Sequence, residues 1–307
     1  MPLTFRSTLR SALALALPLG AVAALSFNTA ASASSDGASW PTIAKQAAIA
    51  AEVPSAITSS GNLTVASDAT YAPMEYIASD GSTVVGVDVD FMKAISQVLG
   101  LKLQMSNVTF DSIIPKLQTG AYDVGASSFT DTKAREKVVN FVNYFQAGES
   151  FYEAKGSKAL SGTGLTQICG LTVAVELGTQ EQSDAQTAST LCTKAKKAGV
   201  TVLTYNTQTL ANAAVASGNA KIGFADSEVT NYIVASSKGT FVNTGKVYGT
   251  APYGFAVVKG GPNAKLDKAI LDATNYIIKH GQYGTIIKYW GQSAGKLSAA
   301  TLNKAIS

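Results

Sequence analysis

The stretch Tyr122-Asp-Val-Gly-Ala-Ser127, which continues as Ser128-Phe-Thr-Asp131, predicts a short strand followed by a tight connection. Thr132 is then a suitable N-cap for a short helix over residues 133–137. This helix would carry Arg135 in its first turn, beside free backbone N–H groups and the positive end of the helix dipole, where a cation is disfavoured. The position of this arginine therefore needs an explanation.

A cation among free N–H groups is typical of a site that holds an anion. Hydroxyls, backbone N–H groups and a guanidinium can all donate hydrogen bonds to a carboxylate or a phosphate. The connection places three hydroxyls close to Arg135, on Ser127, Ser128 and Thr130. The alternative is that Arg135 is an ordinary solvated residue, and the rest of the chain decides between the two interpretations.

Length and composition allow a large core and exclude some partners. The chain has 307 residues, of which 46% are hydrophobic, so it is long enough for two lobes. The formal charge is +4, but Arg6 and Arg10 lie in the leader, which leaves 22 basic against 20 acidic side chains. Basic residues do not cluster with aromatic ones, so we expect neither nucleic acid nor a membrane surface as a partner.

The first 33 residues have the pattern of a signal peptide. A basic region with Arg6 and Arg10 precedes an apolar stretch over residues 11–27, and Ala31-Ser-Ala33 is a cleavage pattern. We expect cleavage after Ala33 and a soluble, exported product, with an uncleaved anchor as the alternative. The cleavage region has no cysteine, so a lipid anchor is not indicated.

Cys169 and Cys192 are the only cysteines, and export favours a disulfide between them over two free thiols. A catalytic cysteine is disfavoured because the only histidine, His280, falls in a helical pattern far along the chain. The sequence shows no set of metal ligands and no cofactor motif.

Short apolar strands alternate with amphipathic helices, which predicts α/β lobes with mainly parallel sheets. The expected strands are 63–67, 101–108, 122–127, 171–177, 200–205, 221–225 and 253–258. The expected helices are 90–99, 112–119, 180–197, 208–217, 228–236, 265–279 and 283–289.

Linker-type sequence at residues 155–164 and 245–252 predicts two crossings between lobes, a topology that permits hinge closure. The first lobe would then be discontinuous, and the second lobe would be inserted into it. The predicted boundaries are 61–154 with 252–292 for the first lobe, 155–251 for the second, 34–60 for an N-terminal extension and 293–307 for a C-terminal tail. The extension has a helical stretch near 43–52, and we assign it no function.

Polar or aromatic residues follow five of the expected strands. Ligands of open α/β sheets bind beyond the carboxyl ends of strands, so these side chains are expected to converge on one cleft. They are Asp68, Tyr71, Phe110, Asp111, the segment from Ser127 to Arg135, Gly178, Thr179 and Asp226.

Each of these residues also has a purely structural alternative. Asp68 could cap a turn, and Tyr71 and Phe110 could be core aromatics. Thr179 could serve only as a helix cap, and Asp226 could cap the helix that begins near residue 228. All these alternatives would have to hold at the same kind of position, which favours a shared site.

At this point the sequence resembles the family 3 extracellular solute-binding proteins, which serve ABC transporters for polar amino acids. The resemblance spans residues 61–292 in order. It is carried by Leu63-Thr-Val-Ala-Ser-Asp-Ala-Thr-Tyr71, Gly86-Val-Asp-Val-Asp90, Phe110-Asp-Ser-Ile-Ile-Pro115, the segment Ser127–Phe141, Asp226-Ser-Glu-Val229 and Gly281-Gln-Tyr283 with Lys288-Tyr-Trp290. It implies the type II periplasmic-binding-protein fold, with two α/β lobes joined by two crossover segments.

The resemblance also implies roles for the candidate residues. Arg135 would bind the α-carboxylate of an amino acid, helped by Thr130 and Thr179, and Asp226 would accept from the α-ammonium. Because burying a zwitterion requires both charges to be paired, such a pair on opposite lobes would couple binding to closure. The side chain of the ligand would lie between Tyr71 and Phe110, with its polar end at Asp68.

Some residues depart from the family pattern. Met74 stands where the family usually has an aromatic residue, and Thr130 replaces a common serine. The turn over residues 176–180 does not align residue by residue. Asp68 with Glu176 nearby would favour a polar or cationic side chain in the ligand. Asp88 and Asp90 are interpreted as a helix N-terminus with Asp90 capping, and not as a metal pair.

The leading functional hypothesis is an exported protein, in the periplasm or another extracytoplasmic space, that delivers a free amino acid to the membrane permease of an ABC importer. It would act as a monomer, without a cofactor. A second hypothesis is an exported lyase or dehydratase on the same fold, with Asp68 or Glu176 as acid or base. A third is a protein that presents its ligand to a separate receptor.

Overall fold

The computed structural model describes residues 37–157, 160, 162–261, 263 and 265–305. The predicted signal peptide, residues 1–33, lies outside this part of the chain. Within it, none of the helices is both long enough and apolar enough to cross a membrane.

A nine-stranded sheet organises the described residues, with the strand order β5-β1-β6-β11-β7-β10-β8-β9 and with β12 paired to β7. Its strands are β1 (Asn62–Ser67), β5 (Lys102–Asn107), β6 (Val124–Gly125), β7 (Val139–Ala154), β8 (Thr172–Glu176), β9 (Thr201–Tyr205), β10 (Ile222–Asp226), β11 (Phe241–Val258) and β12 (Lys296–Leu302). A small separate sheet contains β2 (Thr70–Tyr71), β3 (Glu75–Ile77) and β4 (Val84–Val85).

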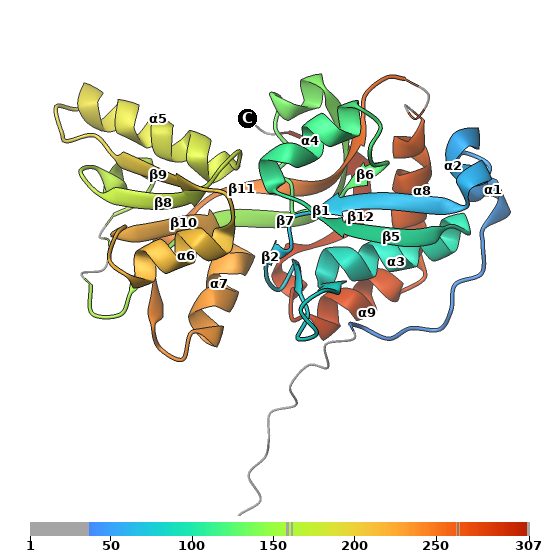
Figure 1. The fold of residues 1–307 in the computed structure, drawn as a ribbon, viewed down its shortest axis with the longest axis horizontal. Helices are drawn as coiled ribbons and strands as arrows, with labels where there is room; N and C mark the ends of the chain where they lie inside the picture. The colour runs from blue at the N-terminus through green and yellow to red at the C-terminus, as the bar shows by residue number, and fades with distance from the viewer. Residues whose placement is uncertain (1–36, 158–159, 161, 262, 264, 306–307) are drawn as a thin grey trace, which may run out of the picture. The chain divides into compact units, whose positions relative to one another are not determined.

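Two long antiparallel strands, β7 and β11, pair with each other in the middle of the strand order (Figure 1). The early part of β7 pairs with β12 and the late part of β11 pairs with β6, whereas residues 149–152 of β7 pair with β10. The register between the two strands shifts near Tyr248 and Thr250. The partner of β7 thus changes from β12 to β10 within the strand itself. The expected linker over residues 155–164 follows the end of β7. The lobe boundaries stay a prediction.

The parallel pairs β1–β5, β1–β6, β8–β9 and β8–β10 follow the expected α/β pattern. The helices are α1 (Ala47–Ala50), α2 (Ser55–Ser60), α3 (Val87–Leu99), α4 (Phe110–Gln118), α5 (Gln180–Lys194), α6 (Gln208–Ala216), α7 (Ser227–Ser236), α8 (Leu266–Lys279) and α9 (Gln282–Tyr289). Short 3-10 turns lie at Arg135–Lys137, Leu165–Ile168 and Ser293–Gly295. The seven strands and seven helices expected from the alternating pattern are present, most with ends shifted by a few residues, but the strand expected at 253–258 is the end of the much longer β11.

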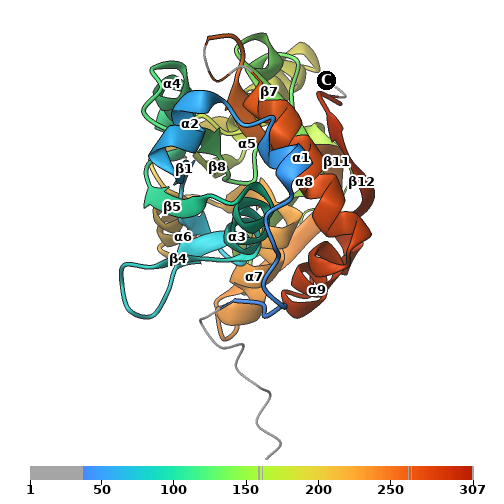
Figure 2. The ribbon, with the colours of Figure 1, turned by 90° about the vertical axis from the view of Figure 1, so that its right-hand side faces the viewer.

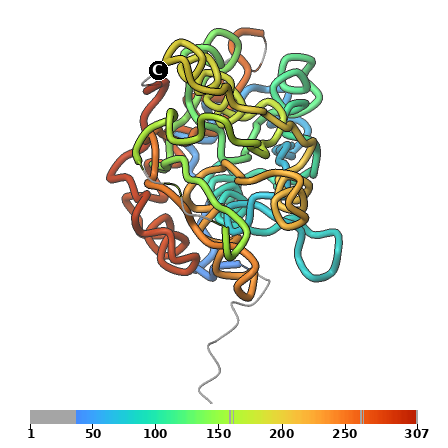
Figure 3. Tube along the Cα trace, turned by 90° about the vertical axis from the view of Figure 1, so that its left-hand side faces the viewer, coloured from blue at the N-terminus to red at the C-terminus, as the bar shows by residue number. Residues whose placement is uncertain are grey.

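Connection handedness places the helices of the later strands. The chain crosses from β8 to β9 through α5 and returns from β9 to β10 through α6, in opposite directions along the sheet. Right-handed crossings therefore put α5 and α6 on opposite sides of these strands, as Figures 1 and 3 show.

The start of α3 corrects one expectation. The helix begins at Val87 rather than at Asp90, because Gly86 adopts φ 138°, a conformation open to glycine, and takes the N-cap position. Asp90 therefore does not cap α3. Its carboxylate instead accepts hydrogen bonds from the backbone N–H of Ala38 at 2.7 Å and from the indole of Trp290 at 2.8 Å.

The described parts of the N-terminal extension and the C-terminal tail belong to the core. Ile43, Val53 and Ile57 are buried, and α1 packs against α3 and α8 (Figure 2). The tail forms β12 on β7, and the backbone N–H of Lys304 donates to Asp131 at 2.8 Å. Both segments therefore contribute to the stability of the part that contains β1 and β5.

The expected disulfide between Cys169 and Cys192 is confirmed, with the two Cα atoms 5.5 Å apart. It ties the turn before β8 to α5, and Cys192 lies in a buried apolar cluster with Val173 and Phe224. Closing a loop of 23 residues contributes about 3 kcal/mol to the free energy of unfolding in the chain-entropy model.

Candidate ligand-binding site

Eight of the nine predicted site residues line one cavity of about 10 Å³, which we name the narrow cavity. The strand ends do converge, since the residues come from the segments that follow β1, β5, β6, β8 and β10. The residues that line the narrow cavity are Tyr71, Phe110, Ser127, Ser128, Thr130, Arg135, Thr179, Gln180, Glu181, Gln208, Ala225 and Asp226. Asp68, the ninth predicted residue, lies beside this cavity without lining it.

Arg135 is half-buried and held from two directions. Its Nη1 donates to the carbonyl of Thr130 at 2.7 Å, and its Nη2 donates to the carbonyl of Gly178 at 2.9 Å. The guanidinium carbon also lies 5.3 Å from the ring centre of Phe110 and 5.5 Å from that of Phe129. These bonds occupy two of the five donors of the guanidinium and fix its plane.

The short helix that carries Arg135 differs from the expected one. It is a 3-10 turn that starts at Arg135, not a helix over 133–137. Ala134 and not Thr132 takes the N-cap position of this turn, although the hydroxyl oxygen of Thr132 accepts from the backbone N–H of Arg135 at 3.2 Å. Loss of hydration lowers the pKa of Arg135, while Glu181 and Asp226 oppose this shift, so the guanidinium keeps its charge among carboxylates.

Ser127 and Ser128 direct their hydroxyls away from Arg135. The two hydroxyls donate to the carboxylate of Glu75 at 3.3 and 3.2 Å, and the backbone N–H of Ser128 donates to Asp88 at 3.0 Å. The hydroxyl oxygen of Ser127 also accepts from the backbone N–H of Asp68 at 2.9 Å. In this arrangement the serines fix the connection itself, and Glu75, which sequence analysis missed, supports them from the core.

Asp88 and Glu75 form a buried acidic pair below these serines. Burial raises the pKa of Asp88 to about 6, although it accepts a hydrogen bond from the hydroxyl of Tyr144 at 2.6 Å. Burial and then the charge of Asp88 raise the pKa of Glu75 well above its ordinary value.

This pair predicts a pH dependence of stability. A carboxyl group whose pKa is raised in the folded state stabilises that state below its unfolded pKa, and the stabilisation is lost as the pH rises through the folded pKa, here about 6. We therefore expect the wild type to lose roughly 1–3 kcal/mol of unfolding free energy relative to Asp88→Asn between pH 4 and pH 7. Urea unfolding at several pH values measures it, and a constant difference would contradict the raised pKa.

Asp226 ends β10 and occupies the N-cap position of α7, but its side chain makes no capping hydrogen bond. The structural alternative for this residue therefore finds no support in the geometry. Burial raises the pKa of Asp226 well above its ordinary value, followed by the charge of Glu181. A cationic ligand group would remove this destabilisation of the charged carboxylate.

Thr179 does serve its helix. Its hydroxyl oxygen accepts from the backbone N–H of Gln182 at 3.2 Å, and its O–H donates to the carbonyl of Glu176 at 2.9 Å. The side chain of Gln182 reaches back to the N–H of Gly178 rather than to that of Thr179. Thr179 also lines the narrow cavity, so the capping role and a contact with a ligand are compatible.

Tyr71 and Phe110 both line the narrow cavity, with ring centres 5.8 Å apart in an edge-on arrangement. Both also belong to a buried apolar cluster, as the core alternative expects. Asp68 accepts from the hydroxyl of Thr70 at 2.7 Å and from the backbone N–H of Phe110 at 3.0 Å. Both of its carboxylate oxygens are therefore engaged.

Glu176 lies next to Asp68 and Tyr71. Both of its carboxylate oxygens are buried without a hydrogen-bond partner, and burial followed by the charge of Asp68 raises its pKa to about 10. The expected acidic end of the site is thus present, but neither Asp68 nor Glu176 lines a described cavity.

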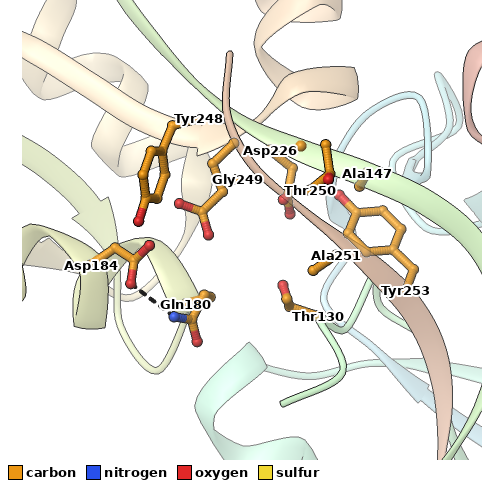
Figure 4. Close-up of a pocket in the computed structure, with 12 residues that line it drawn as sticks. Thr130, Ala147, Gln180, Asp184, Asp226, Tyr248, Gly249, Thr250, Ala251 and Tyr253 are labelled. Carbon is orange, nitrogen blue, oxygen red and sulfur yellow. Dashed lines mark hydrogen bonds between the residues drawn. The ribbon is translucent and has the colours of Figure 1, made fainter. Parts of the chain in front are cut away.

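A second, larger cavity adjoins the first and was not expected from the sequence (Figure 4). We name it the acidic cavity; its volume is about 210 Å³. In Figure 4, Asp184 and Tyr248 lie on one side of it and Asp226 and Tyr253 on the other. It is lined by Thr130, Ala147, Gly148, Glu149, Gln180, Asp184, Asp226, Tyr248, Gly249, Thr250, Ala251 and Tyr253.

Comparison with known proteins shows which family the chain belongs to. Residues 63–293 match the bacterial extracellular solute-binding proteins, family 3. The chain belongs to this family. Over 257 residues it is 33% identical to the arginine-binding protein ArgT of Corynebacterium glutamicum, covering 83% of each chain. It is 32% identical over 211 residues to the ABC transporter glutamine-binding protein GlnH of Bacillus subtilis, covering 67% of this chain and 72% of that protein.

Solved structures of similar proteins have the same fold. A mutant of ArgBP from T. maritima superimposes with a TM-score of 0.69 at 31% identity, covering 78% of this chain and 98% of that one. The expected type II periplasmic-binding-protein fold is thereby confirmed. The family and these relatives are binding proteins, so this chain is a binding protein rather than the lyase or dehydratase considered as an alternative.

Proposed function

We propose that this family 3 protein captures an amino acid outside the cytoplasm, in the periplasm or an equivalent space, and delivers it to the permease of an ABC importer. The observation that carries the proposal is the placement of Arg135 and Asp226 on the same narrow cavity. A guanidinium and a carboxylate in one partly desolvated space pair both charges of an amino-acid zwitterion. The names of the curated relatives support the same class of ligand.

The charge of the site favours a cationic side chain in the ligand. Among the residues that line the two cavities, Arg135 is the single basic side chain, whereas four are acidic, namely Glu149, Glu181, Asp184 and Asp226. A ligand with a second positive charge would balance this excess, whereas a neutral or acidic side chain would not. We therefore propose arginine or a similar dibasic amino acid as the preferred ligand, with glutamine as the neutral comparison.

Closure about two lobes would join the halves of the site. The bond from Arg135 to the carbonyl of Gly178 links the segment before β7 to the turn after β8, and the N–H of Gln208 donates to the hydroxyl of Thr70 at 3.2 Å. We propose that these bonds mark the contact between lobe 1, residues 61–154 with 252–292, and lobe 2, residues 155–251. The protein would close as a monomer around its ligand.

A thermal-shift screen of the exported protein against the common amino acids tests this function. A ligand present at a hundred times its Kd adds roughly 2.7 kcal/mol to the free energy of unfolding, which should raise the melting temperature by about 5–10 °C for a chain of this size. We expect the largest shift with a dibasic amino acid. The absence of a shift with every amino acid, in protein shown to carry no bound ligand, would overturn the proposal.

A further inference from the structure

The end of the chain extends beyond the family match and reaches the segment that carries Arg135. The match ends at residue 293, but the chain continues as β12 and a short stretch after it. We name residues 296–305 the C-terminal segment. Its strand pairs with β7, and its last three residues contact the chain on both sides of Arg135. The sequence predicts only a tail here, so these contacts need an explanation.

Asn303 fixes the direction in which the chain leaves β12. Its φ of 51° lies in the left-handed region, which asparagine tolerates better than most residues. Its backbone N–H donates to the carbonyl of Phe141 at 3.0 Å, and its side-chain oxygen accepts from the N–H of the same residue at 2.8 Å. Its side-chain amide also donates to Asn140 at 3.0 Å. These bonds fix the course of the chain just before the residues that follow.

The next two N–H groups bind on either side of Arg135. The backbone N–H of Lys304 donates to Oδ2 of Asp131 at 2.8 Å, and the following N–H donates to Oε1 of Glu136 at 3.2 Å. Asp131 directly follows Thr130, whose carbonyl accepts from Nη1 of Arg135. Glu136 directly follows Arg135. The two contacts therefore hold both ends of the stretch that presents the guanidinium.

Asp131 is the better buried of the two acceptors. Its Oδ2 also accepts from the side-chain amide of Asn143 at 2.9 Å, and the side-chain oxygen of Asn143 accepts from the N–H of Lys304 at 3.1 Å. Burial raises the pKa of Asp131 to about 6, and the donors Asn143 and Lys304 oppose this shift. A buried carboxylate is destabilised when it loses a donor, so release of the C-terminal segment should disturb Asp131 and its neighbours.

We propose that the C-terminal segment positions Arg135 for the carboxylate of the ligand, and that it acts through the positioning residues Asp131 and Glu136. This inference rests on the proposed function, because it requires Arg135 to bind that carboxylate. One of the carbonyls that orient the guanidinium, that of Thr130, belongs to the stretch that the C-terminal segment holds. Paired hydrogen bonds from a guanidinium depend on geometry, so a loosened stretch should weaken carboxylate binding although the cation stays.

The variant Lys304→Pro in the full chain tests this inference. Proline has no N–H to donate to Asp131, and it pushes the residue before it toward an extended conformation, so this variant should release the chain after β12. Lys304→Ala is the matched control, because the lysine side chain is exposed and alanine keeps the N–H. Titration calorimetry would compare arginine with argininamide, in which an uncharged amide replaces the carboxylate.

The loss of affinity should depend on the carboxylate of the ligand. In Lys304→Pro we expect arginine to bind roughly 5- to 30-fold more weakly, and argininamide less than about threefold more weakly. Lys304→Ala should bind both ligands like the wild type. In an Arg135→Ala background, Lys304→Pro should change arginine affinity by less than about twofold, because the C-terminal segment acts through that guanidinium.

A milder variant covers the case in which the proline variant does not fold, as judged by circular dichroism. Asn303→Gly keeps the left-handed φ, which glycine accepts, but removes the side-chain hydrogen bonds to Asn140 and Phe141. We expect it to weaken arginine binding by roughly 2- to 10-fold, again with a smaller effect on argininamide.

The outcomes separate this inference from the function on which it rests. Equal losses of arginine and argininamide would show that the C-terminal segment supports the fold as a whole, and the inference would be wrong. Unchanged arginine affinity in a folded Lys304→Pro variant would also overturn it. A wild type that binds arginine and argininamide equally well would remove the role of Arg135, and a wild type that binds no amino acid would remove the proposed function itself.

Discussion

Replacing Arg135 with alanine is expected to weaken amino-acid binding by roughly 100- to 1,000-fold. The change would leave the α-carboxylate of the ligand in a partly buried cavity without its cationic partner. The guanidinium is already oriented by the carbonyls of Thr130 and Gly178 and by the rings of Phe110 and Phe129, so no other residue at the narrow cavity can replace it. Titration calorimetry at matched ionic strength measures the loss.

Two further variants show whether the fork of the guanidinium or only its charge is needed. Arg135→Lys keeps a cation but loses paired, planar donors, and we expect an intermediate loss of affinity. Lys137→Ala removes a basic side chain that lies on the same 3-10 turn, is exposed and lines neither cavity, and should bind like the wild type. Unchanged affinity in Arg135→Ala would show that the arginine is structural.

Replacing Asp226 with asparagine is expected to weaken arginine binding by roughly 10- to 100-fold, because the α-ammonium loses its charged acceptor. The same ligand without its α-amino group, 5-guanidinovalerate, should lose less than about threefold. The two ligands differ only in the α-amino group that Asp226 would bind. The carboxylate of Asp226 makes no capping hydrogen bond to α7, so its removal should affect the ligand rather than the helix.

Glu228→Gln provides the matched control for Asp226→Asn. Glu228 lies in the first turn of α7, near Asp226, but it lines neither cavity and accepts a hydrogen bond from Ser227 at 3.1 Å. We expect this variant to bind both ligands normally. Similar losses of arginine and of 5-guanidinovalerate in Asp226→Asn would mean that Asp226 acts only at the start of its helix.

The parts of the site that lie at strand ends were predictable from sequence. Parallel strands end at a common edge, so Tyr71, Phe110, Thr130 and Asp226 could be grouped without knowing any distance. Arg135 was conspicuous because its place in a first helical turn is unfavourable for a cation. The structure brings these residues together, while their contacts with a ligand stay a prediction.

The acidic cavity could not be predicted in the same way. Glu149 lies inside β7, a long strand that the sequence does not mark, because most of its residues are buried by partners on both sides and show no alternation. Asp184 has the spacing of an ordinary surface residue on α5. Their meeting depends on the pairing of β7 with β10 and on the position of α5, which are long-range features.

The hydroxyls of Ser127 and Ser128 are a similar case. They were expected to face the ligand, but Glu75 accepts both of them across a separation of 52 and 53 residues. A local pattern cannot reveal such a partner. It does show that the connection is polar, which is why its residues were found while the direction of their hydroxyls was not.

A crystal structure of the protein with bound arginine tests the central claim most directly. The account predicts the α-carboxylate on the guanidinium of Arg135 and the α-ammonium on Asp226. Arginine bound away from Arg135 and Asp226, with both side chains keeping their present contacts, would contradict it.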